Sequence, residues 1–312
     1  MIDRKPRLLA LRALNLGDLL VAVPALRALR TGFPGHHIIL AAPQWLGEVV
    51  DLIGSVDELL PTSGLDTAIA VGRQDIDVAV NLHGNGAQSR SLLDAVGARV
   101  KIGHRAPGWD GPEWIDDIHE RHRWTRLLTE HRVAADPEDF RLQRPKVPGI
   151  DPGAVVVHVG AAYNSRKWPT ERFAAVARVL RRSGRRIILT GSAAERPRAL
   201  EVAELSGLAE DSVVTGKTSL GGLAAWIANA ALLISADTGA AHLASAFATP
   251  SVVLFGPAPP ARWGPPRGPH IVLTDEAVRR GDVFASTPDP ALLAVTAQDV
   301  LDAVATLPVD RL

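Results

Sequence analysis

The sequence SADTGAAHLASAFATPSVVLFGP, residues 235–257, passes from an apolar run through a helical pattern into a second apolar run. Three polar residues, Asp237, Thr238 and His242, stand where the first run would end as a strand and a helix would begin. The helical pattern is rich in alanine, which lets a helix pack closely against a sheet. A strand, a helix and a second strand in this order indicate a parallel sheet.

The same alternation of apolar runs and helical patterns extends outward from this stretch. In the first half it predicts strands at 7–14, 36–42, 77–82 and 99–104, with helices at about 17–31, 45–53 and 87–97. In the second half it predicts strands at 154–160, 185–190, 211–215, 231–236, 251–255 and 270–274, with helices at 170–182, 194–206, 219–229 and 238–248. Such a pattern is typical of α/β proteins whose parallel sheets are covered on both faces.

Residues 135–153 contain four prolines and no periodic pattern, which marks them as a linker between two domains. We therefore expect a Rossmann-like, doubly wound domain at 1–145 and another at 146–295, facing each other across a cleft. A last helix near 296–307, in the segment 296–312, is a candidate to cross back to the first domain.

Composition excludes several classes of function. The formal net charge of the 312 residues is zero, so no global basic field predicts a nucleic-acid partner. No apolar run approaches the roughly 20 residues that span a bilayer, so we expect a cytoplasmic protein with at most peripheral membrane contact. The absence of cysteine excludes disulfides, thiolate catalysis and cysteine-bound metals. The sequence gives no prediction of the oligomeric state.

Ligands of open parallel sheets bind beyond the carboxyl ends of the strands, so the strand-to-helix turns are the places to search. The first turn, NLGDLLVAVP, carries Asn15, Gly17 and Asp18. Asp18 is either a first-turn acid that complements the helix dipole or a carboxylate placed to accept a proton. The residues alone leave both interpretations open.

The turn AAYNSRKWP, residues 161–169, places Arg166 and Lys167 just before a helix that begins near Pro169 and Thr170. Two cations at a helix N-terminus have the unfavourable sign for the helix dipole, so they predict a bound anion, most simply a phosphate. Solvated surface charge is the alternative.

In the opening stretch, Thr238, Gly239 and Ala240 would form a helix N-terminus at which backbone N–H groups can approach a phosphate, with His242 in the first turn. His242 is otherwise a histidine satisfied within a helix start. Glu195, in the turn GSAAER, could bind a ribose hydroxyl pair, and it is equally typical of a first helical turn.

Two stretches resemble nucleotide-binding motifs, but each lacks a glycine that its motif requires. TGKTSL at 215–220 lacks the first glycine of a P-loop, and Ser219 is better interpreted as a helix N-cap. NLHGNGAQSR resembles a dinucleotide fingerprint without its third glycine. No metal-binding motif is present, so we expect no essential metal.

Several blocks together resemble family 9 glycosyltransferases, the ADP-heptose-dependent heptosyltransferases of lipopolysaccharide core assembly. They are NLGDLLVAVPALRALRTGFP, DVAVNLHGNGAQSR, VVHVGAAYNSRKWPTERFAAVARVL, ILTGSAAER, GKTSLGGLAAWIANAALLISADTGAAHLASAFATPSVVLFGP and ARWGPP. They span nearly the whole chain. The resemblance implies a GT-B fold, with the acceptor bound by the N-terminal domain and the nucleotide sugar by the C-terminal one.

The resemblance also implies an inverting, metal-independent transfer with an ADP-sugar as co-substrate and no cofactor. Asp18 is then the general base, and Lys167 binds the diphosphate. The donor sugar and phosphates fall to Asp237, Thr238, Gly239, Ala240 and His242, while Glu195 binds the ribose and Thr218 lies near the adenine.

The acceptor is less defined. Asn15, Gly17, His83, Arg90 and Arg105 are its candidate ligands, scattered rather than gathered into a dense basic cluster. A saccharide or a soluble small molecule therefore fits as acceptor. A nucleotide-sugar epimerase or hydrolase on the same fold and a non-catalytic nucleotide-sugar-binding protein are the alternatives, while the imperfect glycine pattern disfavours an NAD-dependent dehydrogenase.

Overall fold

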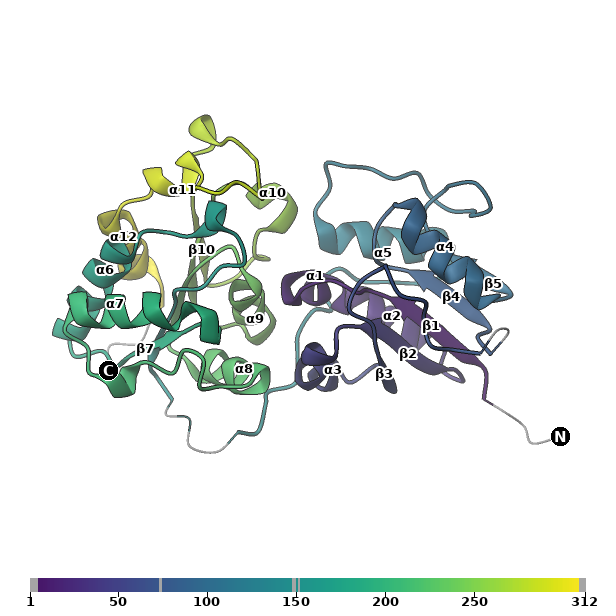
Figure 1. The fold of residues 1–312 in the computed structure, drawn as a ribbon, viewed down its shortest axis with the longest axis horizontal. Helices are drawn as coiled ribbons and strands as arrows, with labels where there is room; N and C mark the ends of the chain where they lie inside the picture. The colour runs from purple at the N-terminus through teal and green to yellow at the C-terminus, as the bar shows by residue number, and fades with distance from the viewer. Residues whose placement is uncertain (1–4, 73–74, 148–149, 151, 309–312) are drawn as a thin grey trace. The chain divides into compact units, whose positions relative to one another are not determined.

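A computed structural model describes residues 5–72, 75–147, 150 and 152–308. The chain forms two compact units, Met1–Gln143 and Arg144–Leu312 (Figure 1). The division falls within the predicted linker 135–153, of which residues 148, 149 and 151 lie outside the described part.

The first unit is built on a parallel sheet with strand order β3-β2-β1-β4-β5. Its strands are β1 (Arg7–Leu11), β2 (His37–Ala42), β3 (Glu58–Pro61), β4 (Val78–Asn81) and β5 (Val100–Ile102). Its helices are α1 (Leu16–Val21), α2 (Val23–Gly32), α3 (Gly47–Ile53), α4 (Ala87–Val96) and α5 (Glu120–Glu130).

The second unit is also built on a five-stranded parallel sheet, but its strand order is β10-β9-β8-β6-β7. Its strands are β6 (Val155–His158), β7 (Ile187–Thr190), β8 (Leu232–Ala236), β9 (Ser251–Leu254) and β10 (His270–Leu273). Its helices are α6 (Thr170–Arg182), α7 (Arg196–Ser206), α8 (Leu220–Asn229), α9 (Gly239–Phe247), α10 (Pro260–Trp263), α11 (Pro290–Ala294) and α12 (Ala297–Thr306). The predicted α/β class with two doubly wound sheets is confirmed.

Four elements differ from the prediction. The single helix expected at 17–31 is two helices, α1 and α2, because Pro24 lacks an N–H group and its ring would collide with the carbonyl four residues earlier. The strand expected at 211–215 is reduced to one bridge between Leu189 and Val213. Strand β3 and helix α5 were not predicted.

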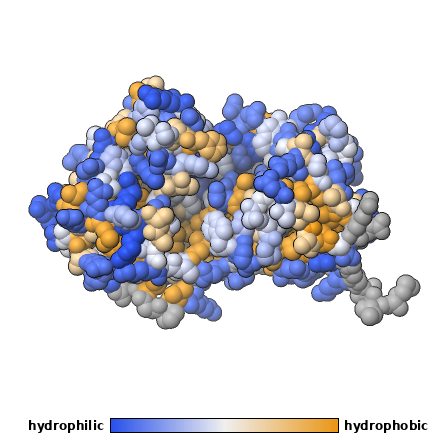
Figure 2. Space-filling model, in the orientation of Figure 1, coloured by the Kyte–Doolittle hydropathy of each residue, from blue (hydrophilic) through white to orange (hydrophobic). Residues whose placement is uncertain are grey.

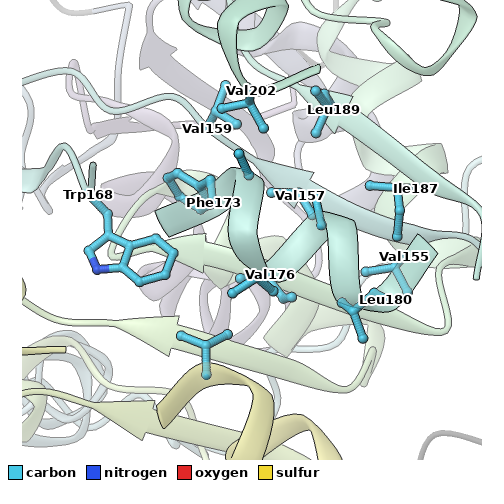
Figure 3. Packing of buried hydrophobic residues seen from close by; sticks show 14 of the residues in the cluster. Val155, Val157, Val159, Trp168, Phe173, Val176, Leu180, Ile187, Leu189 and Val202 are labelled. Carbon is cyan, nitrogen blue, oxygen red and sulfur yellow. The ribbon is translucent and has the colours of Figure 1, made fainter. Parts of the chain in front are cut away.

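The core of the second unit fixes the loop that precedes α6. Figure 3 shows Phe173 and Val176 of α6 packed among side chains of β6 and β7. The ring of Trp168 meets that of Phe173 edge to face, with centroids 4.8 Å apart, and both side chains are buried. Each such side chain contributes roughly 1.5–3 kcal/mol through burial. The residues just before Trp168 are therefore anchored by the core.

The last helix packs within the second unit. Helix α12 contacts α6, β9 and β10, and its apolar side chains Val300 and Ala303 join the same core. These contacts place α12 on the C-terminal sheet, whereas the sequence offered it as a candidate to cross back to the first domain.

Hydrophilic and hydrophobic residues are interspersed over the face drawn in Figure 2. Among the described residues, no helix is both long and apolar enough to cross a membrane. Phe284, with 71% of its surface exposed, lies against Tyr163 at a ring-centroid distance of 5.0 Å.

Candidate functional site

The second unit has its topological switch point between β6 and β8. Strand β6 pairs with β7 on one side and with β8 on the other, and His158 at its end is in register with Ser235. The crossover helices leave to opposite faces at such a point, so the loops that follow the two strands part there and leave room for a ligand. These loops carry the sequence-predicted Lys167 on one side and Asp237, Thr238 and Gly239 on the other.

Helix α9 begins at this switch point, as predicted. Thr238 is its N-cap residue with an extended backbone, but its side chain makes no capping hydrogen bond. The Thr238 hydroxyl instead lies 3.0 Å from the hydroxyl of Ser235. The first N–H groups of the helix, at Gly239 and Ala240, are thus not capped by this side chain. A helix N-terminus in this state is suited to an anion.

Asp237 organises the cations around this helix start. Nη1 of Arg166 donates to the Asp237 backbone oxygen at 3.2 Å and lies 3.4 Å from its Oδ2. The other carboxylate oxygen, Oδ1, lies 4.0 Å from Nε2 of His242. The Asp237 side chain is only 5% exposed, whereas that of Arg166 is 25% exposed. The buried carboxylate therefore holds a cation that faces outward.

Lys167 is held by its backbone while its head group stays unengaged. Its N–H donates to Asn164, and the next residue, Trp168, donates its indole N–H to the Val295 oxygen at 3.0 Å. On the other side Ser165 donates its hydroxyl to the Val283 oxygen at 2.6 Å. Within the described part of the chain, the structure gives the Lys167 ammonium group no ion pair. It is available to a ligand anion.

A small cavity adjoins this cluster. Its lining includes Asp237, His242, Ser245 and Trp263. The rings of His242 and Trp263 lie 6.3 Å apart between centroids. His242 therefore stands between the buried carboxylate and an aromatic wall.

Glu195 and Thr218 lie on neighbouring loops at the end of β7. The Gly216 N–H donates to the Gly191 oxygen at 3.1 Å, which ties the loop of Thr218 to the loop of Glu195. Glu195 forms a capping box with Ser192, whose N–H donates to its Oε2 at 2.6 Å. A Cβ atom at Gly160 would overlap the Glu195 carboxylate, so the glycine is needed for this approach. Of the two roles that the sequence left open for Glu195, the one at the helix start is thus present.

His158 lies beneath this carboxylate. Its Nδ1 is 3.0 Å from the Thr190 hydroxyl. Burial lowers the pKa of His158, while the nearby Glu195 carboxylate acts in the opposite direction. Burial therefore disfavours the charged form of this imidazole. Ser219, the predicted N-cap of α8, accepts from the Gly222 N–H at 3.2 Å as expected.

The first unit has its switch point between β1 and β4, and Asp18 lies beside it. Asp18 is in the first turn of α1, and its side chain is 25% exposed. Arg12, directly after β1, donates through Nε to the Asp18 backbone oxygen at 2.9 Å, and its Nη2 lies 3.6 Å from Oδ1. Arg12 also donates to the Leu82 oxygen after β4, so it joins the loops that follow the two central strands.

Two histidines of this unit are held neutral by burial. Desolvation lowers the pKa of His83 to about 4, with the charge of Arg12 acting in the same direction and that of Asp18 against it. Desolvation, followed by the charge of Arg123, lowers the pKa of His104 to about 4 as well. His104 is 2% exposed and packs edge to face against the rings of Trp114 and Trp124.

The remaining predicted acceptor ligands are dispersed. Asn15 and Gly17 lie in the turn of Asp18. His83 lies close enough to Asp18 for the carboxylate charge to act on the pKa of the imidazole. Arg90, in α4, donates to the Asn85 oxygen of the loop before that helix at 2.7 Å. Arg105 is paired with Glu113 at 3.1 Å. The structure therefore brings His83 to Asp18 and engages both arginines elsewhere.

Sequence reasoning missed Arg12 as a site residue. The signal was an arginine at the end of an apolar strand, where a cation must be paired if it is buried. Among the described residues, no group of three or more histidine or acidic side chains could hold a metal ion.

Residues 125–277 match the model of glycosyltransferase family 9 (heptosyltransferase). The chain carries a glycosyltransferase family 9 domain. The matched region includes every predicted donor residue, from Lys167 through Glu195 and Thr218 to His242. Asp18 lies outside it.

Known relatives agree with this assignment. The chain is 37% identical over 130 residues to lipopolysaccharide heptosyltransferase 1 of Pseudomonas aeruginosa, which covers 40% of this chain and 36% of that protein. It is 23% identical over 292 residues to lipopolysaccharide heptosyltransferase 1 of Escherichia coli K12, which covers 83% of this chain and 90% of that protein. The prediction that the chain is a glycosyltransferase is confirmed.

Solved structures show the same fold. A family 9 glycosyl transferase from Veillonella parvula has a TM-score of 0.78 at 22% identity and covers 98% of each chain. The E. coli heptosyltransferase WaaC with ADP has a TM-score of 0.72 at 21% identity and covers 96% of this chain and 99% of that one. The predicted GT-B fold class is confirmed.

Proposed function

We propose that the protein transfers a sugar, most simply a heptose, from an ADP-sugar to a hydroxyl group of a saccharide acceptor of the lipopolysaccharide type. One observation carries the proposal. Arg166 is paired with Asp237 beside the anion-suited start of α9, and Lys167 follows Arg166 in the loop at the switch point of the second unit. A relative that binds ADP shares this fold.

The proposed reaction is a single displacement at the anomeric carbon with inversion. The acceptor hydroxyl gives its proton to the Asp18 carboxylate as its oxygen bonds to the anomeric carbon. The bond from that carbon to the diphosphate oxygen breaks at the same time, and ADP leaves with the electron pair. Asp18 fits this role because its carboxylate is partly exposed while its cationic partner is buried.

The departing diphosphate acquires negative charge, which the second unit is arranged to receive. Lys167, Arg166 and the α9 N–H groups supply fixed positive charge and dipoles, and each such group is typically worth about 3 kcal/mol of barrier. His242, held beside Asp237, is placed for the donor sugar or phosphate, while Glu195 and Thr218 are the proposed nucleoside ligands. Because these groups supply the positive charge, we propose that the transfer needs no metal ion and proceeds in the presence of EDTA.

Calorimetric titration with ADP, UDP and GDP, followed by an assay of ADP release from ADP-heptose with lipopolysaccharide core saccharides, tests this function. We expect tighter binding of ADP than of the other two nucleotides, and acceptor-dependent ADP release that EDTA does not abolish. Equal affinity for the three nucleotides would count against an ADP-sugar donor. ADP release that does not require a saccharide would indicate a hydrolase instead.

A further inference from the structure

We propose that Arg12 is the positioning residue for Asp18, whose carboxylate it fixes in the direction that proton transfer requires. The inference rests on the proposed function, in which Asp18 receives the acceptor proton. Nothing in the family match covers Arg12, because the matched region begins at residue 125.

The guanidinium group of Arg12 holds Asp18 at two points. Nε binds the backbone oxygen of Asp18 at 2.9 Å, and Nη2 lies 3.6 Å from the carboxylate Oδ1. Nη1 donates to the Leu82 oxygen in the loop after β4. All three guanidinium nitrogens are therefore engaged, and the group fixes both the backbone and the side chain of Asp18 relative to the sheet.

The helix that carries Asp18 does little by itself to hold the side chain in one direction. Helix α1 has six residues, and its N-cap residue Asn15 makes no side-chain capping hydrogen bond. Helices this short are not stable by themselves. A partly exposed carboxylate on such a helix needs an external contact to keep one direction, and Arg12 supplies it.

Burial of Arg12 is hard to explain by stability alone. Its side chain is 1% exposed and lies over the ring of Trp124, with the guanidinium carbon 4.6 Å from the ring centroid. Burial lowers the pKa of Arg12, against the opposing charges of Asp18 and Glu120. A buried ion pair contributes little net stability, since desolvation offsets the attraction. We therefore attribute the burial of Arg12 to the fixed direction that it gives the Asp18 carboxylate.

The same unit contains a matched control. Arg121 is also buried, lies over the Phe140 ring at 4.7 Å and pairs with Glu138 at 3.1 Å. It also donates to the Pro137 oxygen at 2.8 Å. Arg121 thus repeats the buried guanidinium, the aromatic face and the single carboxylate of Arg12, without contacting Asp18.

The test compares Arg12→Met with Arg121→Met in steady-state ADP release from ADP-heptose with core saccharides. We expect kcat of Arg12→Met to fall about 100-fold, the typical effect of misplacing a catalytic group by about 1 Å. KM for the donor should stay within about twofold, because the donor residues lie in the second unit, and Arg121→Met should keep the wild-type kcat. Equal kcat losses in the two variants would show a structural role only and overturn the proposal.

Two further variants cover the case in which Arg12→Met does not fold. Arg12→Lys keeps the charge and one donor, so it should recover part of kcat. Arg12→Ala should regain activity when guanidinium chloride is added at millimolar concentration, whereas urea, its neutral analogue of similar shape, should restore none. Rescue by both compounds or by neither contradicts the proposal.

A readout without catalysis separates this proposal from the proposed function. If the wild-type protein transfers no sugar, the function fails, but a double-mutant cycle of Arg12→Met and Asp18→Asn on the thermal midpoint still tests the pairing. We expect the two shifts to be non-additive. Additive shifts would show that Arg12 does not hold Asp18.

Discussion

Both units are built on a parallel sheet and carry an arginine–aspartate pair at its switch point, yet the exposure of the two partners is reversed. In the first unit Arg12 is 1% exposed and Asp18 25%, whereas in the second Arg166 is 25% exposed and Asp237 5%. The first unit therefore presents an anion and the second a cation. Two parallel sheets therefore present opposite charges because each buries a different partner of its ion pair.

The largest expected effect follows from removing the anion that the first unit presents. Asp18→Asn keeps the shape of the side chain but cannot take up the acceptor proton. We expect kcat to fall by about 10²–10⁴-fold with donor affinity unchanged, the usual contribution of a general base. Measurement of ADP release at saturating donor checks this, with Asp51→Asn at an exposed position of α3 as the control. A rate within a factor of three of wild type would remove Asp18 from the mechanism.

The next effect concerns the aromatic surroundings of the first unit, where His104 is buried as a neutral imidazole. Since its pKa of about 4 lies below the ordinary value of 6.5, the unfolded chain binds more protons between these pH values. Stability is therefore complete above about pH 6.5 and decreases as the pH falls toward 4. Lowering the pH from 7 to 5 should remove about 2 kcal/mol of unfolding free energy through His104.

Urea unfolding of wild type and His104→Leu at pH 7 and pH 5 measures this contribution. The variant should lose about 2 kcal/mol less than wild type over that interval, while the free energy that His83 loses remains. His122→Gln, at an exposed position of α5, is the matched control. An unchanged pH dependence in His104→Leu would show that this imidazole is not held neutral.

The smallest expected effect is on the cation side of the comparison. Lys167→Met removes one unengaged ammonium group and leaves Arg166 and the α9 N-terminus in place. We expect ADP to bind about tenfold more weakly, the equivalent of about 1.4 kcal/mol for one charged hydrogen bond. Lys146→Met, at an exposed lysine of the same unit outside the proposed donor-binding loops, is the control. Equal affinity of Lys167→Met and wild type would place the diphosphate elsewhere.

Much of the second unit could be predicted from the sequence because its strands are unbroken apolar runs and its helices are amphipathic. Helix α6 begins at Thr170 and ends at Arg182 as predicted, since Pro169 and the apolar stripe of Phe173, Val176 and Leu180 define it. Strand β3 escaped because it is short and contains glutamate and proline. Helix α5 escaped because the residues that it buries include Glu120, Arg121 and Arg123, which interrupt the apolar stripe.

The sequence predicted which strand-to-helix turns form the candidate site, but not which side chains form ion pairs within it. Lys167, Asp237 and Thr238 stand at strand ends, where the topology of a parallel sheet brings them together. The pairing of Arg166 with Asp237 joins residues 71 positions apart, and no local pattern indicates it. Which partner of each ion pair is buried depends on packing, as the contact of Arg12 with Trp124 shows. The reversed exposure could therefore only come from the structure.

The most direct test of this division of roles is calorimetric titration of ADP into Asp18→Asn and Lys167→Met, with transfer rates measured on the same preparations. This division of roles predicts that Asp18→Asn binds ADP with wild-type affinity and has lost transfer, whereas Lys167→Met binds ADP about tenfold more weakly. Loss of ADP affinity in Asp18→Asn equal to that in Lys167→Met would contradict it.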